Sequence, residues 1–126
     1  MKIPSALLFV VLLMAGCATP APHVRLPAPY TVHGISVAVT GLLTDGYGNV
    51  VGVSGLATNV SGHDVTLCQI NFDVLDASGT KVSGIVAETN GLRAGQRWRF
   101  QGAFMNPFPI GFSSIEPGPV TVVPAS

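Results

Sequence analysis

Apolar residues recur at every second position along several short stretches of the chain. The clearest stretch is residues 65–76, in which the apolar set is Cys68, Ile70, Phe72 and Val74 and the polar set is Gln69, Asn71 and Asp73. A period of two is typical of a β-strand that buries one face. We therefore expect the apolar set to point into a core and the polar set to face solvent.

Further stretches of this kind are separated by clusters of turn-forming residues. The expected strands cover residues 35–43, 50–59, 80–89, 97–104 and 120–123, and the expected turns cover residues 44–49, 60–64, 76–79 and 90–96. No window has a sustained helical period, and 15 glycines and 10 prolines interrupt the chain. Short strands separated by turns about every 8–12 residues are typical of β-sandwiches. The pattern therefore predicts an all-β fold, a single antiparallel β-sandwich of two packed sheets.

The start of the chain has a different pattern. Residues 6–16 form an uncharged apolar run that follows Lys2. This run of 11 residues extends roughly 16 Å as a helix, whereas a bilayer core needs about 20 residues. Residues 1–16 are therefore expected to be a cleaved secretory signal peptide.

Met14, Ala15 and Gly16 lead directly to Cys17. This arrangement resembles the lipobox of bacterial lipoprotein precursors, with Met14 where leucine is usual. The resemblance implies that Cys17 receives a diacylglycerol and becomes the acylated N-terminus after cleavage. Because Ala18 and not aspartate follows, it also implies a lipid-anchored protein of the outer membrane, with a Gram-positive cell surface as the alternative.

Residues 17–29 contain four prolines and show no periodicity. They are expected to form an extended tether that lifts the following domain by roughly 40 Å, at about 3 Å per residue. Residues 30–126 are expected to form one domain, because a segment of this length suits a single small core.

Charge and cysteine content narrow the function classes. Charged residues make up 10% of the chain, against about 25% in an average protein. Five basic and six acidic side chains follow residue 16. This balance gives no excess of positive charge of the kind that nucleic-acid-binding proteins use. Cys68 is the only cysteine besides Cys17. With Cys17 lipidated, no intramolecular disulfide is expected, and Cys68 is expected to be buried and inert.

Several short segments resemble the bacterial FxLYD domain, over about residues 50–105. They are GLATN at residues 55–59, FDVLD at 72–76, DASG at 76–79 and LRAGQRWRF at 92–100. Val74 and Leu75 stand where the family motif has leucine and tyrosine. The resemblance implies an immunoglobulin-like β-sandwich of the kind common in bacterial surface lipoproteins, with no established activity and no catalytic residues.

One expected turn holds Ser61, His63 and Asp64. They include a nucleophile, a base and an acid, but a catalytic triad needs its base oriented by a group from elsewhere in the fold. Turn formation is the better interpretation for these residues and for Asn59 just before them. The three histidines have no ligand-like spacing. We therefore expect no catalytic residue, no metal site and no cofactor.

Two segments are candidate contact sites. Arg93, Arg97 and Arg99 lie around Trp98 and either bind an anionic ligand or form the solvated face of a strand. In the apolar segment 104–112, the residues expected to contact a partner or the membrane are Phe108, Ile110 and Phe112. The alternative is that this segment closes one end of the sandwich.

Taken together, these patterns predict a lipid-anchored module of the cell envelope and no enzyme. The expected role is structural or interactive, with the bilayer as one partner through Cys17 and an envelope protein as another. The alternative is a ligand-binding or inhibitor domain that recognises an anionic envelope glycan or lipid through Arg93, Arg97 and Arg99.

Overall fold

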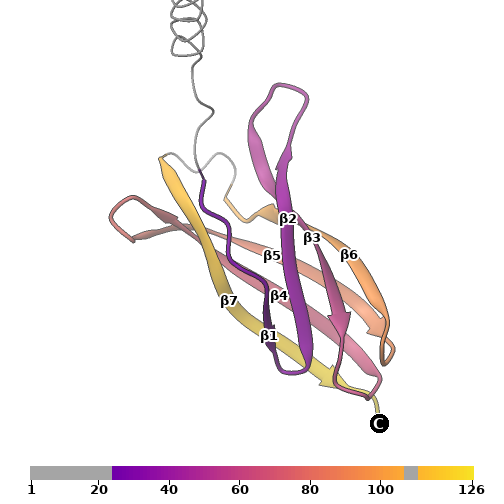
Figure 1. Cartoon of the computed structure of the whole chain (residues 1–126). Coiled ribbons are helices and arrows are strands. Elements are labelled where there is room, and N and C mark those ends of the chain that lie inside the picture. The colour runs from indigo at the N-terminus through magenta and orange to yellow at the C-terminus, as the bar shows by residue number, and fades with distance from the viewer. Residues whose placement is uncertain (1–23, 107–110) are drawn as a thin grey trace, which may run out of the picture.

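Seven β-strands form the regular structure of the computed structural model, which describes residues 24–106 and 111–126 (Figure 1). The strands are β1 (Tyr30–Val32), β2 (Ile35–Thr44), β3 (Val50–Asn59), β4 (Val65–Asp76), β5 (Lys81–Leu92), β6 (Arg97–Phe104) and β7 (Phe112–Pro124). Neighbouring strands pair antiparallel throughout. The all-β antiparallel fold predicted from the sequence is confirmed.

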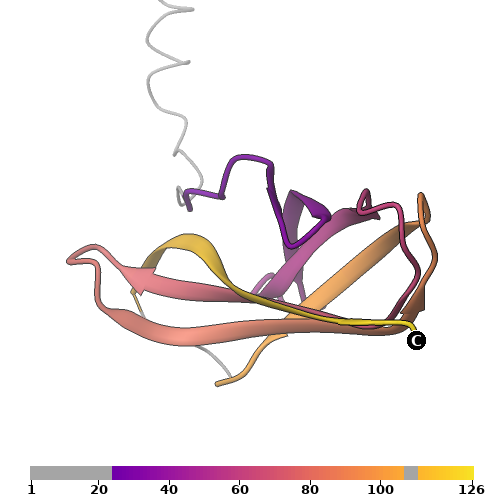
Figure 2. The ribbon, with the colours of Figure 1, turned by 90° about the horizontal axis from the view of Figure 1, so that it is seen from below.

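The strands form two layers. Their order in the sheet is β1-β2-β3-β6-β5-β4-β7, and β6 pairs with β5 at only two positions, Ile85 with Phe104 and Val86 with Ala103. At this corner the sheet folds over, so that β1, β2, β3 and β6 form a first layer over a second layer of β5, β4 and β7 (Figure 2). The result is a sandwich, nearly closed into a barrel, whose edge strands are β1 and β7.

The core lies between the layers and follows the alternation of β4. Cys68, Ile70, Phe72 and Val74 are all at most 1% exposed, as their spacing predicts. Opposite them, β6 contributes Phe100, whose ring stacks on that of Phe72 with centroids 6.0 Å apart. This pair joins the two layers at the centre of the molecule.

Gly55 lies inside β3, where a glycine is typical of a bulge or of a close neighbour. A Cβ atom added at Gly55 would lie 2.4 Å from Cζ of Phe100 and 2.4 Å from the carbonyl oxygen of Ala38. The Phe100 ring therefore rests directly on the backbone of β3, and only glycine leaves room for it.

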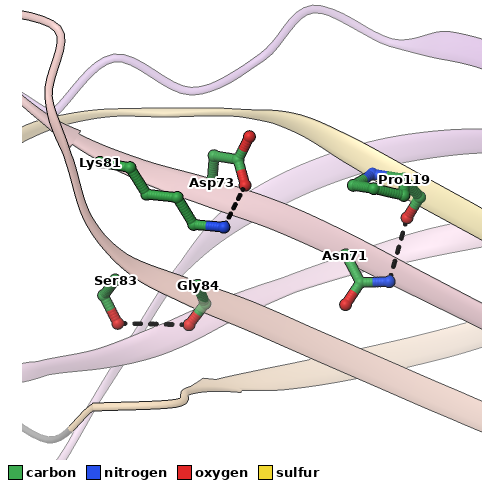
Figure 3. A network of polar contacts seen from close by, with 6 residues as sticks. All are labelled: Asn71, Asp73, Lys81, Ser83, Gly84 and Pro119. Carbon is green, nitrogen blue, oxygen red and sulfur yellow. Dashed lines mark hydrogen bonds and ion pairs between the residues drawn. The ribbon is translucent and has the colours of Figure 1, made fainter.

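The outward residues of β4 form polar contacts with both neighbouring strands (Figure 3). Lys81 Nζ lies 3.0 Å from Asp73 Oδ1, and Asn71 Nδ2 donates a hydrogen bond of 3.1 Å to the carbonyl oxygen of Pro119. These groups are partly exposed, so each contact contributes little to stability. Their positions confirm that the polar set of β4 faces away from the core.

Two aspartates close the turns at one end of the sandwich. Asp45 Oδ1 accepts hydrogen bonds from the backbone N–H groups of Asn49 and Tyr47, and these bonds lower the pKa of its carboxyl group. Asp76 Oδ1 accepts bonds from the Ser78 hydroxyl and from the Thr80 N–H, which lower its pKa in the same way. Such side-chain bonds to the following backbone are why aspartate favours these turns.

Two strands are longer than their side-chain pattern predicts. β7 covers Phe112–Pro124, although only residues 120–123 read as a strand, because Pro117 and Pro119 lack the N–H group that a central strand needs. β7 is an edge strand, with a register shift between its pairs with Ile70 and Phe72, and both features accommodate proline. β5 continues to Leu92, through residues 90–92 that were expected to begin a turn.

The chain contacts the sandwich before the expected domain boundary at residue 30. The Arg25 N–H donates to the carbonyl oxygen of Ser113 over 3.0 Å, and the Ile115 N–H donates to the carbonyl oxygen of Arg25 over 2.9 Å. Arg25 and Ser114 thus form a parallel bridge on the outer edge of β7. Val24 and Leu26 pack against the core. Residues 24–26 are therefore attached to the domain and not free in the tether.

Tyr30 gives the fold a predicted sensitivity to alkaline pH. Its hydroxyl is buried with no hydrogen-bond partner among the described residues, and burial raises its pKa from 10.0 to about 12. The folded state therefore keeps the proton longer than the unfolded chain does. The associated stability is fully present below about pH 10 and is lost as the pH rises towards about 12.

We expect Tyr30→Phe to remove this dependence. Because it deletes an unpaired buried hydroxyl, it should leave the free energy of unfolding at neutral pH unchanged or higher by up to about 1 kcal/mol. Above about pH 10 the variant should lose less stability than the parent protein. Urea unfolding at neutral and alkaline pH measures both quantities. Identical alkaline losses in the two proteins would contradict the assignment to Tyr30.

Candidate functional site

Arg97 and Arg99 project from the outer face of β6. Both are exposed, and they pair across the sheet with Thr58 and Leu56 of β3. Arg93 is also exposed but lies in the turn before β6, where its N–H donates to Gln96 Oε1. Among the described residues, the ion pairs involve only Arg25 and Lys81 as cations. The structure thus places two of the three candidate arginines on one face, with the third at its end.

The two layers carry charge of opposite sign. β1, β2 and β3 have no charged residue, so Arg97 and Arg99 dominate the outer face of this side of the sandwich. The second layer carries most of the acidic groups, including Asp73 on β4, Glu88 on β5 and Glu116 on β7. A partner that approaches the β3–β6 face therefore meets positive charge.

The apolar segment before β7 is described only in part. Phe108 and Ile110, two of the three expected contact residues, lie outside the described residues. Phe112 begins β7 and packs edge-to-face on Phe104, with ring centroids 5.4 Å apart and planes at 73°. Part of the Phe112 ring is therefore covered within the domain. The first part of β7 lies beside residues 24–26, which form the bridge to Ser114 (Figure 1).

The two cysteines fall in different parts of the chain. Cys17, the expected lipidation site, lies outside the described residues. Cys68 is fully buried in the core, and burial raises the pKa of its thiol. A raised pKa disfavours the reactive thiolate.

Within residues 24–106 and 111–126, no helix has the length and apolar character needed to cross a bilayer.

Ser61, His63 and Asp64 do not form a catalytic arrangement. The Ser61 hydroxyl donates over 2.7 Å to Asn59 Oδ1 and accepts a bond from the His63 backbone N–H. Asp64 Oδ1 accepts a bond of 2.9 Å from the N–H of Ala94. The serine and the aspartate thus hold backbone in place, and neither bonds the His63 ring. The turn interpretation fits these contacts.

Asn59 lies at the centre of the hydrogen bonds that hold the loop with Ser61, His63 and Asp64. Its side chain is fully buried at the end of β3, where Nδ2 donates to the carbonyl oxygens of His63 (2.7 Å) and Leu92 (2.9 Å). Its backbone N–H donates to Gln96 and its carbonyl accepts from Gly95. One residue therefore joins the β3–β4 loop to the β5–β6 turn. The sequence predicted a turn asparagine, but nothing in the pattern predicted the second connection.

An open groove of about 740 Å³ lies between the two edges of the sheet at this end of the molecule. One side is the β1–β2 turn with His33, and the other is the last part of β7, with Val120, Thr121, Val122 and Pro124, followed by Ala125. Ser61, His63, Asp64 and Val65 close its end. No sequence signal predicted the groove, because it depends on how far β1 and β7 diverge.

The described residues contain no group of three or more histidine, cysteine, aspartate or glutamate side chains placed to hold a metal ion. Comparisons of the chain with protein-family models, with curated proteins and with solved structures found no match.

Proposed function

We propose that this chain is a bacterial lipoprotein of the outer membrane whose β-sandwich, of the FxLYD type, binds another protein of the cell envelope. The domain has no enzymatic role in this proposal. Cys17 anchors it, and the sandwich presents its faces and edges to the partner.

The observation that carries the proposal is the order of residues 6–17: a short apolar run, then small residues, then cysteine. The run is shorter than the roughly 20 residues needed to span a bilayer. Acyl chains on Cys17 would supply the anchor, at about 0.8 kcal/mol for each buried methylene, and two chains are needed for stable attachment.

The contacts of the polar groups support a binding role over a catalytic one. Ser61 and Asp64, which have the side chains needed for hydrolysis, bond to the loop and turn backbone around them. The features left over for function are surfaces: the arginine pair on β6, the groove beside β7 and the apolar end near Phe112. Binding of an anionic glycan or lipid at Arg97 and Arg99 is the second candidate, favoured by the absence of acidic residues on β1, β2 and β3.

Metabolic labelling with palmitate tests the anchor. We expect Cys17→Ser to abolish labelling and to leave an uncleaved or soluble precursor, because no other thiol is accessible for lipidation. Cys68→Ala is the matched control and should keep full labelling, since Cys68 is buried in the folded domain. Undiminished labelling of Cys17→Ser would refute the anchor.

Purification of the labelled protein from membranes then separates the two candidates. A stoichiometric envelope protein supports the interaction role. Recovery of a glycan or lipid that is lost from Arg97→Ala, with no protein bound, supports the second candidate instead.

A further inference from the structure

The free edge of β7 is the starting point for a more specific inference. β7 pairs with β4 on one side, and on the other side its first part is covered by the bridge between Arg25 and Ser114. From residue 117 to residue 124 that outer side has no strand partner among the described residues. An uncovered strand edge presents unpaired N–H and C=O groups, which favour the addition of another strand. Pro117, Pro119 and Pro124 have no N–H group, so the part of this edge able to pair is residues 120–123.

We propose that the groove beside β7 binds one extended segment of the partner protein, added as a strand along residues 120–123. The proposal deepens the interaction role and rests on it. It assigns the partner a backbone conformation and the site a location.

The chain itself shows that this edge accepts an extended segment. Arg25 binds the neighbouring part of β7 through two main-chain hydrogen bonds of 3.0 and 2.9 Å, to Ser113 and Ile115. The chain then leaves the edge to form β1 with β2. An added strand would continue the row that residues 24–26 begin, in the space opened by that departure.

The groove has the size of a short strand. One residue of a packed strand occupies roughly 3.3 Å along the strand, 4.8 Å between strands and 10 Å between layers, or about 160 Å³. The groove of about 740 Å³, which is open to solvent, therefore has room for a strand of a few residues. On β7 its lining consists of Val120, Thr121, Val122 and Pro124.

The lining indicates an apolar partner segment. Val122 is the partly exposed valine of the lining, while Val65 and Val120, 5% and 7% exposed, already belong to the core. The lining contains no lysine or arginine. Its one carboxylate, Asp64, already accepts a bond from Ala94. Main-chain bonds to β7 would supply affinity, and every second side chain of the partner would fill the space over the valines. We therefore expect a segment with apolar residues at alternate positions.

The test uses the full chain in detergent and a phage-displayed library of random peptides as the probe. We expect selection of peptides with apolar residues at every second position. Val122→Asp, which places a charge in the groove, should weaken their binding by about tenfold or more. The matched control is Val123→Asp on the same strand; Val123 is 43% exposed and lies outside the groove, so its change should be under about twofold.

Amide hydrogen exchange on the unaltered protein provides a measurement that needs no variant. Bound peptide should slow exchange at residues 120–123. Failure to select any peptide, equal weakening by the two variants, or protection elsewhere would overturn the proposal. So would self-association of the protein that Val122→Asp abolishes, because the occupant would then be a second copy. None of these results affects palmitate labelling at Cys17, so failure here is distinguishable from failure of the anchored-module proposal.

Discussion

Replacing Phe72 with alanine should lower the free energy of unfolding by about 3–5 kcal/mol. Phe72 is 1% exposed and stands in the middle of β4, the strand paired on both sides by β5 and β7. Its ring also stacks on Phe100 across the two layers. The substitution therefore leaves a cavity where the layers meet, and the strands around it have little freedom to close it.

The size of this loss matters because whole domains are stable by only about 5–15 kcal/mol. Urea unfolding measures this loss of free energy, provided that the slope of the free energy against urea concentration is the same for the variant and the parent protein. Phe72→Leu should lose less, since most of the buried volume remains. Val123→Ala, at an exposed position of β7, should change stability by no more than about 0.5 kcal/mol. A loss for Phe72→Ala as small as that of Val123→Ala would mean that the faces of β4 are reversed.

Asn59→Ala should cost about 3 kcal/mol, although it removes only a small polar side chain. The amide donates to the carbonyl oxygens of His63 and Leu92 and accepts from Ser61, all at the same end of the core. Its removal leaves the buried Leu92 carbonyl without this partner and breaks the bonds to His63 and Ser61, and each unpaired buried group costs about 1–3 kcal/mol. Water that enters the site would offset part of the loss.

Asn49→Ala is the matched control for this prediction. Asn49 is exposed in the β2–β3 turn, and its amide reaches only Asp45, over 3.3 Å. Its loss should be about 0.5 kcal/mol or less. Thermal unfolding of both variants compares them directly. Equal midpoints for Asn59→Ala and Asn49→Ala would show that the buried network contributes nothing to stability.

The sequence predicted the layers of this protein well because burial on one face leaves a mark at every second residue. That mark is clear in β4, where Ile70, Phe72 and Val74 alternate with polar residues. The alternation is lost where the backbone, and not the burial of side chains, determines the structure. Pro117 and Pro119 conceal half of β7, since their fit depends on β7 being an edge strand with a shifted register.

The candidate sites were less accessible to sequence reasoning for a related reason. The alternation of β6 places Arg97 and Arg99 together correctly, because their relation is local. Asn59 bonds to Leu92 across 33 residues of chain, and His33 and Val122 line the same groove only because of how the layers are arranged. Such pairings follow from the folded topology and leave no pattern along the chain.

The bridge between Arg25 and β7 also fixes how far an anchored domain can travel. Between an acylated Cys17 and the first attached residue, Val24, only residues 18–23 remain, which reach roughly 20 Å when fully extended. On the proposed anchor at Cys17, a tether of that length would keep the sandwich in the layer of water directly above the lipid headgroups. A binding partner would have to come to the membrane surface, and one held deeper in the envelope would remain out of range.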